Sequence, residues 1–173
     1  MSAGPAARTI VVGVDFSDSS ESALAWAAAE ARAHGCRLLV LHVVHDPADS
    51  PGRYLSLARL LGGRVPQDGE RAEETAARLM EAFLDRARGR LPDLAAAAEV
   101  ATRIVKGVPG PRIAEVAAAE RARQVVLGSR GLGGLRHALL GSTAARVVRL
   151  AELPVTVVKT SRTAAPDAED AGG

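Results

Sequence analysis

The chain has 173 residues, enough for one domain with a substantial core and too few for two ordinary domains. Apolar residues make up 47% of the chain but aromatic residues only 2%, so alanine, valine and leucine must supply the core. The net charge of +2, with scattered arginines and so few aromatic rings, argues against a nucleic-acid-binding surface.

Targeting signals and cysteines are equally sparse. The opening residues, MSAGPAARTI, lack the long apolar run of a secretory signal, and no segment approaches the ~18 apolar residues of a membrane span. Cys36, the single cysteine, excludes an internal disulfide framework and suits a reducing compartment. We therefore expect a cytoplasmic protein that has no membrane partner.

Short apolar runs alternate with segments of helical periodicity along the chain. The runs, rich in Val, Leu and Ile, are typical of strands buried on both faces of a parallel sheet. The predicted strands are residues 9–14, 37–45, 99–105, 124–127 and 154–159. The predicted helices are residues 19–34, 70–90, 111–122 and 142–151.

Capping residues support the helix boundaries. Asp18 and Glu21 have the spacing of a capping box before the first helix, and Gly35 follows its last residue. Pro111 suits the first position of the third helix. In the second helix, the apolar residues recur at helical spacing and indicate a core-facing stripe.

The domain is expected to span residues 8–159 as one unit. Residues 1–7 are predicted to be a flexible N-terminus, and residues 160–173, without apolar pattern, a disordered tail. Residues 46–69 contain several prolines and glycines and are predicted to form a long loop around a short helix.

Five strands alternating with four helices predict an α/β fold of the Rossmann-like type, a five-stranded parallel sheet with helices on both faces. Ligands of such sheets bind beyond the carboxyl ends of the strands, where the strand order reverses. Residues 13–17, 43–46 and 128–142 follow three of the predicted strands. We expect these three loops to meet at one site.

The fourth strand leads into a glycine-rich stretch, GSRGLGGLRHALLGST. Gly128, Gly131 and Gly141 permit φ > 0 and let a ligand approach the main chain. Ser142 and Thr143 stand where the next helix begins, so that unpaired amides and hydroxyls would converge on an anion. A plain turn is the alternative, although the density of glycine exceeds what a turn needs.

Other motifs are absent or weak. Arg136 occupies the last position of G-x-G-x-x-G, so the dinucleotide fingerprint fails, and no P-loop sequence occurs. His42, His45 and Asp46 suggest a metal site, but positions 42 and 45 of a strand point to opposite faces. We therefore assign no metal ligand, and we find no Ser-His-Asp arrangement.

Together these segments resemble the universal stress protein family. The resemblance covers about residues 8–159 and rests on VVGVDFSDSSESALAWA, LLVLHVV, GVPGPRIAEVA and the glycine-rich stretch. Its most specific part is the signature G-x2-G-x9-G-[S/T], which Gly128, Gly131, Gly141 and Ser142 fulfil. In this family the signature marks the ATP-binding branch.

The resemblance implies contacts to ATP from three parts of the chain. Asp15 would lie near the ribose, the Val43 backbone at the adenine edge, and the glycine-rich stretch around the ribose and phosphates. Arg130 either adds a charge-assisted contact to the phosphates or is a solvated surface arginine. The implied nucleotide-binding residues are Gly13, Asp15, Val43, Gly128, Ser129, Arg130, Gly131, Gly141, Ser142 and Thr143. Gly107 either approaches the nucleotide or is a plain turn glycine.

The leading hypothesis is an adenine-nucleotide-sensing regulatory protein of the stress response that holds ATP, with Mg²⁺ or Mn²⁺ as a possible companion, without efficient catalysis. Mg²⁺ bridged between phosphate and Asp15 would permit slow hydrolysis. The alternatives are a slow ATPase or adenylate-transferring enzyme of the adenine nucleotide α-hydrolase-like superfamily, and a nucleotide-independent interaction module. No catalytic residue is assigned, and the regulated partner is unknown.

The last predicted strand bears on oligomeric state. Its sequence, PVTVVK, is β-branched and nearly uncharged, and such an edge invites pairing with another chain. We expect a homodimer formed across two-fold-related fifth strands, which the family resemblance also implies.

Overall fold

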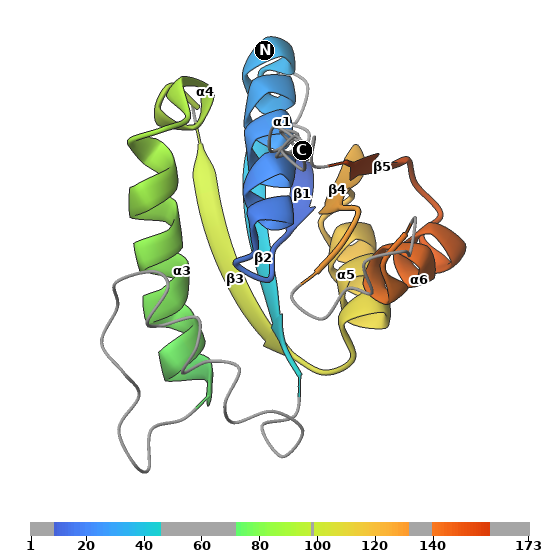
Figure 1. Ribbon diagram of the computed structural model, residues 1–173. Coiled ribbons are helices and arrows are strands. Elements are labelled where there is room, and N and C mark those ends of the chain that lie inside the picture. Colours follow the sequence, from blue (N-terminus) through green and yellow to red (C-terminus); the bar gives the residue numbers. More distant parts are fainter. Residues whose placement is uncertain (1–8, 46–71, 98, 132–139, 160–173) are drawn as a thin grey trace, which may run out of the picture.

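The computed structural model describes residues 9–45, 72–97, 99–131 and 140–159, and these residues build a five-stranded parallel sheet (Figure 1). The order across the sheet is β3-β2-β1-β4-β5, and every pairing is parallel. The strands are β1 (Thr9–Gly13), β2 (Arg37–Val44), β3 (Val100–Lys106), β4 (Gln124–Gly128) and β5 (Val155–Val158). The predicted fold class is confirmed.

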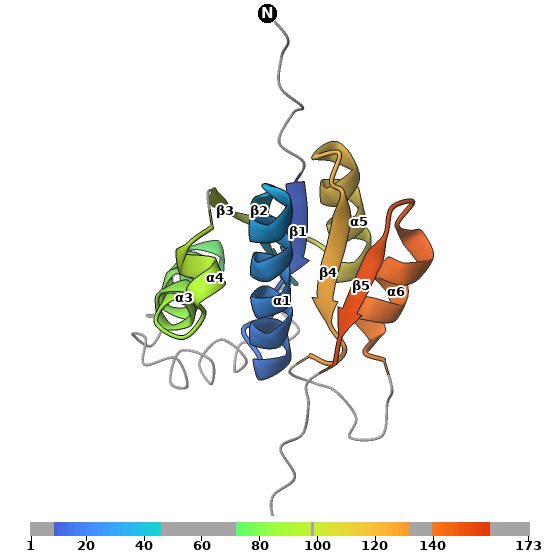
Figure 2. The same ribbon diagram turned by 90° about the horizontal axis from the view of Figure 1, so that it is seen from above.

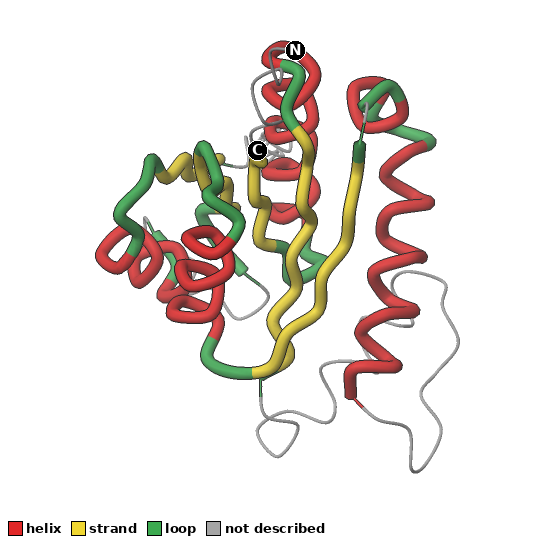
Figure 3. Tube along the Cα trace, turned by 180° about the vertical axis from the view of Figure 1, so that it is seen from behind, coloured by secondary structure: helices red, strands yellow, loops and turns green. Residues whose placement is uncertain are grey.

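Helices cover both faces of this sheet, as Figure 2 shows from above and Figure 3 from behind. The helices are α1 (Asp18–His34), α3 (Ala72–Arg88), α4 (Pro92–Ala95), α5 (Pro109–Ala119) and α6 (Ser142–Leu150). α1, α3 and α4 lie on one face, and α5 and α6 on the other. The short helix α4 was not expected, because the sequence pattern indicated only that α3 ends before Pro92.

Each face has its own aliphatic core. The α1 side packs Ala23, Ala27 and Ala31 against sheet residues such as Val12, with Phe83 from α3. The predicted apolar stripe of α3 is buried as expected: Ala76, Leu79, Met80, Phe83 and Ala87. Alanine at the contact lets helices approach the sheet closely, which explains how a chain with few aromatic residues fills its core.

The helix ends refine the predicted caps. α1 is capped by Ser17 and not by Asp18, because the Ser17 side chain accepts a hydrogen bond from the Ser20 amide. α5 begins at Pro109, two residues earlier than predicted. Gly35 closes α1 as expected, in the left-handed region with φ of 59°. At the start of α1, the capping-box interpretation was wrong by one residue, since it took Asp18 instead of Ser17 as the N-cap.

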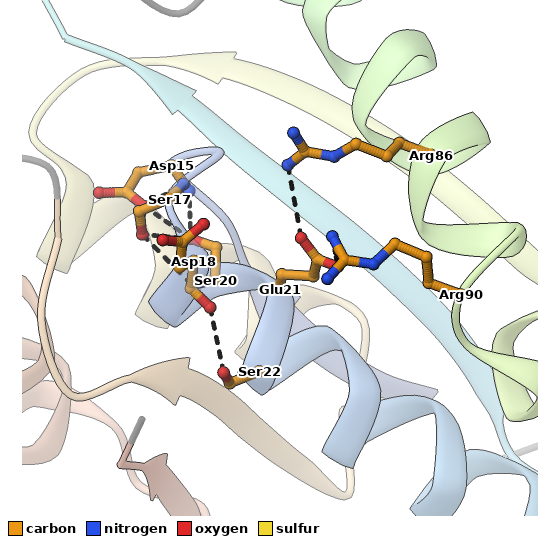
Figure 4. A network of polar contacts seen from close by, with 8 residues as sticks. All are labelled: Asp15, Ser17, Asp18, Ser20, Glu21, Ser22, Arg86 and Arg90. Atoms are coloured by element: carbon orange, nitrogen blue, oxygen red, sulfur yellow. Dashed lines mark hydrogen bonds and ion pairs between the residues drawn. The ribbon is translucent and has the colours of Figure 1, made fainter. Parts of the chain in front are cut away.

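Ion pairs join α1 to the last turn of α3 and to the residues just after it. Glu21, in the first turn of α1, has a largely buried carboxylate that lies 3.0 Å from Arg90 and 3.4 Å from Arg86 (Figure 4).

Among the described residues, no helix has both the length and the apolar character that a membrane crossing requires. The predicted N-terminal segment, long loop and tail, residues 1–7, 46–69 and 160–173, lie outside the described residues.

Candidate functional site

The strand order reverses between β1 and β4. From β1 the chain proceeds outward through β2 to β3, and it then crosses to β4 and β5 on the other side. A crevice forms at such a reversal beyond the carboxyl ends of the strands. The residues after β1 and the residues after β4 lie against each other here, because the Arg130 amide donates to Ser19 Oγ at 3.3 Å.

Asp15 forms the wall on the β1 side, and its carboxylate is held by serines (Figure 4). Its Oδ1 accepts from the Ser17 and Ser20 hydroxyls, each at 2.6 Å, and from the Ser17 amide at 3.2 Å. The Asp15 amide in turn donates to Ser20 Oγ at 2.8 Å. Both the side chain and the main chain of Asp15 are therefore fixed relative to the start of α1.

Phe16 completes this turn in a strained conformation. Its φ is 67°, uncommon for a residue with a Cβ, yet its side chain is buried. The ring lies 4.4 Å from the His42 ring and 5.7 Å from the Phe83 ring, measured between centroids. Packing on both sides offsets the backbone strain and sends Asp15 toward the crevice while Phe16 enters the core.

The glycines of the site differ in what fills the space of their missing Cβ. At Gly13 that position lies 2.6 Å from Leu127 Cδ2, and at Gly128 it meets Oγ and the carbonyl of Ser19. Both therefore serve internal packing. At Gly131 the position lies 2.6 Å from Asp15 Oδ2, which places Gly131 directly against the β1 wall.

The signature glycines permit φ > 0, but those described do not use this freedom. Among the described glycines only Gly35 and Gly107 have positive φ, and Gly141 has φ of −68°. The requirement at Gly128 and Gly131 is one of space, because a methyl group would collide with α1 or with Asp15. The middle of the stretch, residues 132–139, lies outside the described residues.

Several backbone groups of the predicted phosphate loop bond within the protein. The Ser129 amide donates to the Val158 carbonyl at 2.8 Å, and the Gly141 amide donates to the Ser129 carbonyl at 2.7 Å. These bonds bring Ser129, Arg130 and Gly141 together, since a Cβ on Gly141 would lie 3.5 Å from Arg130 Cα. They also join the loop to the last residue of β5.

The start of α6 is bare by comparison. Gly141 is the N-cap and has no side chain to accept from the first turn, which contains no acidic residue. Ser142 is exposed and Thr143 half-buried. The leading amides of a helix have no intrahelical acceptor, and the helix dipole makes this end attractive to anions.

Val43 stands beside β1 just beyond the point where β1 ends. The last β1 pairing is Gly13 with Leu41, after which the Val14 amide donates to the Leu41 carbonyl at 2.9 Å. Along a parallel strand, the amide and carbonyl of successive residues point alternately to the strand on one side and the strand on the other. In β2 these neighbours are β1 and β3. Val43 lies two residues after Leu41, so its amide and carbonyl point to the same side as those of Leu41, the side of β1. They point to the side of β2 on which β1 has ended, and the role of Val43 at the adenine edge stays a prediction.

The histidines suggested for metal binding have other neighbours. His42 is buried, with Nδ1 2.8 Å from the Val14 carbonyl oxygen, and His45 Nδ1 lies 3.3 Å from that of Gly107. Among the described residues, no three His, Cys, Asp or Glu side chains cluster to hold a metal ion. Gly107 has φ of 131°, and a Cβ there would lie 2.8 Å from Arg112 Cγ, the geometry of a tight turn.

A comparison with known families agrees with this geometry. The model of the universal stress protein family matches residues 6–159 of the chain. The chain belongs to this family. The universal stress protein in QAH/OAS sulfhydrylase 3′region of Thermus aquaticus is 34% identical over 152 residues, covering 88% of this chain and 98% of the relative. The chain spans about half the length of several mycobacterial universal stress proteins, 51% in one from Mycobacterium tuberculosis.

Solved structures of universal stress proteins share the fold. UspA from Lactobacillus plantarum is 26% identical, with a TM-score of 0.62 over 90% of this chain and 99% of that one. A universal stress protein solved in complex with cAMP is 28% identical, with a TM-score of 0.60 over 89% and 98%. A relative of similar fold thus binds an adenine nucleotide.

The sequence did not identify the serines of α1. Ser17 was placed in the loop of residues 13–17, and Ser19 and Ser20 in the predicted helix of residues 19–34, but no contact to Asp15 or Arg130 was predicted for them. Their signal was visible as hydroxyl residues crowded after Asp15, in DFSDSS. Serine is also one of the preferred residues at a helix start, so the pattern pointed to nothing beyond the helix.

Proposed function

We propose that this universal stress protein binds ATP at the crevice between β1 and β4 and acts as a nucleotide-sensing regulatory protein of the stress response. The observation that carries the proposal is the start of α6, which has no side-chain cap and no acidic residue in its first turn. It lies beside the glycine-rich stretch, whose Gly131 lies against Asp15. Helix amides without acceptors attract phosphate, and the wall opposite presents a fixed carboxylate for hydroxyl groups. The relative in complex with cAMP supports an adenine nucleotide as the ligand class.

In this proposal each wall contacts a different part of the ligand. The Val43 main chain meets the adenine edge, Asp15 meets the ribose, and Ser142 and Thr143 with the Gly141 loop meet the phosphates. Arg130 adds a charge-assisted contact, since its backbone is already fixed by Ser19. Four residues shape the crevice without contacting the ligand through a side chain. The missing side chains of Gly13, Gly128 and Gly131 let the two walls approach each other. The backbone bonds of Ser129 hold the loop in place.

The residues fit a metal only as a companion of the phosphates. Mg²⁺ is commonly held by one or two carboxylates together with substrate phosphates, and Mn²⁺ also suits oxygen ligands. Asp15 is the carboxylate that lies against the glycine-rich stretch. When bound with ATP, such an ion would neutralise phosphate charge, and Asp15 would hold it from the side of β1.

The proposal is tested by two variants at the N-cap of α6 that differ by one charge. In Gly141→Asp the carboxylate occupies the helix amides and repels phosphate, so ATP affinity falls at least about tenfold. Gly141→Asn has the same shape without the charge and loses less. Both variants retain stability within about 0.5 kcal/mol, because Asp and Asn are good N-caps.

Equilibrium binding of ATP by calorimetry, with denaturant unfolding alongside, measures both effects. The proposal is wrong if the unmodified protein shows no ATP binding at millimolar concentration. It is also wrong if Gly141→Asp binds ATP as well as the unmodified protein does. Equal losses in the Asp and Asn variants would attribute the effect to crowding against Ser129 rather than to an anion site.

The same samples separate regulation from the two alternatives. An enzyme that hydrolyses ATP or transfers adenylate would give steady turnover above about 1 s⁻¹, whereas a nucleotide-holding protein turns over more slowly. A nucleotide-independent interaction module would bind its partner equally well with and without ATP. We propose the nucleotide-holding role, in the cytoplasm.

We also propose a homodimer formed through β5. This strand lies at the edge of the sheet, its residues Val155–Val158 are all half-buried, and β4 is its neighbour on the inner side. An uncharged, β-branched edge favours pairing with a second copy. Sedimentation should show a dimer at micromolar protein, and a monomer throughout that range would contradict the assignment.

A further inference from the structure

We propose that Ser20, assisted by Ser17, is the positioning residue that aims the Asp15 carboxylate, and that it thereby sets the recognition of the ribose hydroxyls of the nucleotide. This inference rests on the proposed function, because it concerns the sugar end of the same crevice. It adds a residue of α1 that contacts Asp15 rather than the ligand.

Ser20 holds Asp15 at two points with one hydroxyl. Its Oγ donates to Asp15 Oδ1 at 2.6 Å and accepts from the Asp15 amide at 2.8 Å. A serine hydroxyl has one proton and two lone pairs, so this pair of bonds uses the proton and one lone pair on the same residue. Ser20 is only 4% exposed, which protects both bonds from water.

Ser17 closes the arrangement from the other side. Its hydroxyl donates to the same Oδ1 at 2.6 Å, and its amide lies 3.2 Å from that oxygen. Three donors on one oxygen prevent the carboxylate from rotating, since a rotation would break all of them at once. The position of Oδ2 against Gly131 is therefore dictated by the start of α1.

A fixed carboxylate discriminates between ligands better than a rotating one. A hydroxyl donor bonds strongly to an ionised oxygen only when the oxygen is already in line, because aligning it on binding costs rotamer entropy. Ribose carries two neighbouring hydroxyl donors, whereas a deoxyribose lacks one of them. The serines should therefore affect the preference for ribose over deoxyribose more than they affect overall affinity.

The experiment compares ATP, 2′-deoxy-ATP and 3′-deoxy-ATP on the full chain by calorimetry. The unmodified protein should bind at least one deoxy analogue about ten- to hundredfold more weakly than ATP, the loss expected for a hydrogen bond to a charged group. In Ser20→Ala this preference should fall to about twofold or less, with the affinity for that deoxy analogue changed by less than about threefold.

Two further serines serve as controls. In Ser22→Ala, which removes a hydroxyl that donates to the Asp18 carbonyl and not to Asp15, the preference should be unchanged. In Ser19→Ala, which releases the Arg130 amide on the opposite wall, the three nucleotides should weaken by the same factor. Both substitutions lie in the same helix turn as Ser20, so general fraying of α1 would affect them all.

The outcomes separate the inference from the proposed function. If the unmodified protein binds none of the three nucleotides, the proposed function itself is wrong. If it binds ATP but Ser20→Ala retains the full preference, or weakens all three nucleotides equally, the inference is overturned and the proposed function stands. A preference lost in Ser20→Ala alone establishes the positioning role.

Discussion

The helices α1 and α6 both begin at the carboxyl edge of the sheet, one after β1 and one after β4, yet their first turns are opposites. α1 is capped by the Ser17 side chain and has acidic residues, Asp18 and Glu21, in its first turn. α6 has glycine as its N-cap and no acidic residue in its first turn. The N-terminus of α1 is thus satisfied from within the protein, whereas that of α6 has neither a side-chain cap nor an acidic residue in its first turn.

The contrast shows which features of a helix start create an anion site. The partial positive charge at the N-terminus of α1 is already balanced by its cap and its acidic side chains, so a phosphate there would meet like charge. At α6 the same partial charge meets no acidic side chain of its own first turn. We therefore expect substitutions at the start of α1 to change stability or the preference for ribose, and substitutions at the start of α6 to change the affinity for phosphate.

Phe16→Ala is the most severe way to break the α1 side. The ring is 1% exposed between His42 and Phe83, and removing it leaves a cavity that costs about 3–5 kcal/mol of unfolding free energy. Alanine also has a Cβ and keeps the strain of positive φ, so no relief of backbone strain offsets this loss. Urea denaturation measures the loss, and a change below about 1 kcal/mol would show that this turn is not held by the core.

Ser17→Ala tests the cap itself. The variant leaves the Ser20 amide without its acceptor and should cost about 1 kcal/mol of unfolding free energy, the usual value for an N-cap. Ser22→Ala, in the same helix, is the matched control and should change stability by less than about 0.5 kcal/mol. Equal effects of the two substitutions in urea denaturation would contradict the assignment of Ser17 as the cap.

The fold could be predicted from the sequence because its signals are local and repeated. Each buried strand appears as a run such as TIVV or LLVLHVV, and each run is followed by a segment with helical spacing. The boundaries were less certain: α5 begins at Pro109 rather than Pro111, because either proline suits a first turn. The helix α4 has four residues and no periodic pattern that could indicate it.

The site could be predicted only as a set of loops. The sequence placed Asp15 and the glycine-rich stretch at the same edge, and Asp15 Oδ2 does lie beside Gly131, 2.6 Å from where a Cβ would be. It could not show that Ser19 fills the space beside Gly128, because the two residues are far apart in the chain and meet only through packing. Nor could it separate glycines needed for space from glycines needed for positive φ.

The smallest effect is expected at α5, which also begins at this edge, after β3. Pro109 and Pro111 remove two amides from its first turn, and a Cβ on Gly110 would lie 2.8 Å from Arg146 Cβ of α6, so this helix end is also covered. Pro111→Ala restores one amide in the first turn of α5, next to Gly110, which packs against Arg146. It should change ATP affinity by less than about twofold. It should lower the free energy of unfolding by about 0.5 kcal/mol, because proline restricts the unfolded chain and alanine does not. Calorimetry that showed a fivefold gain in ATP affinity would mean that α5 rather than α6 limits the anion site.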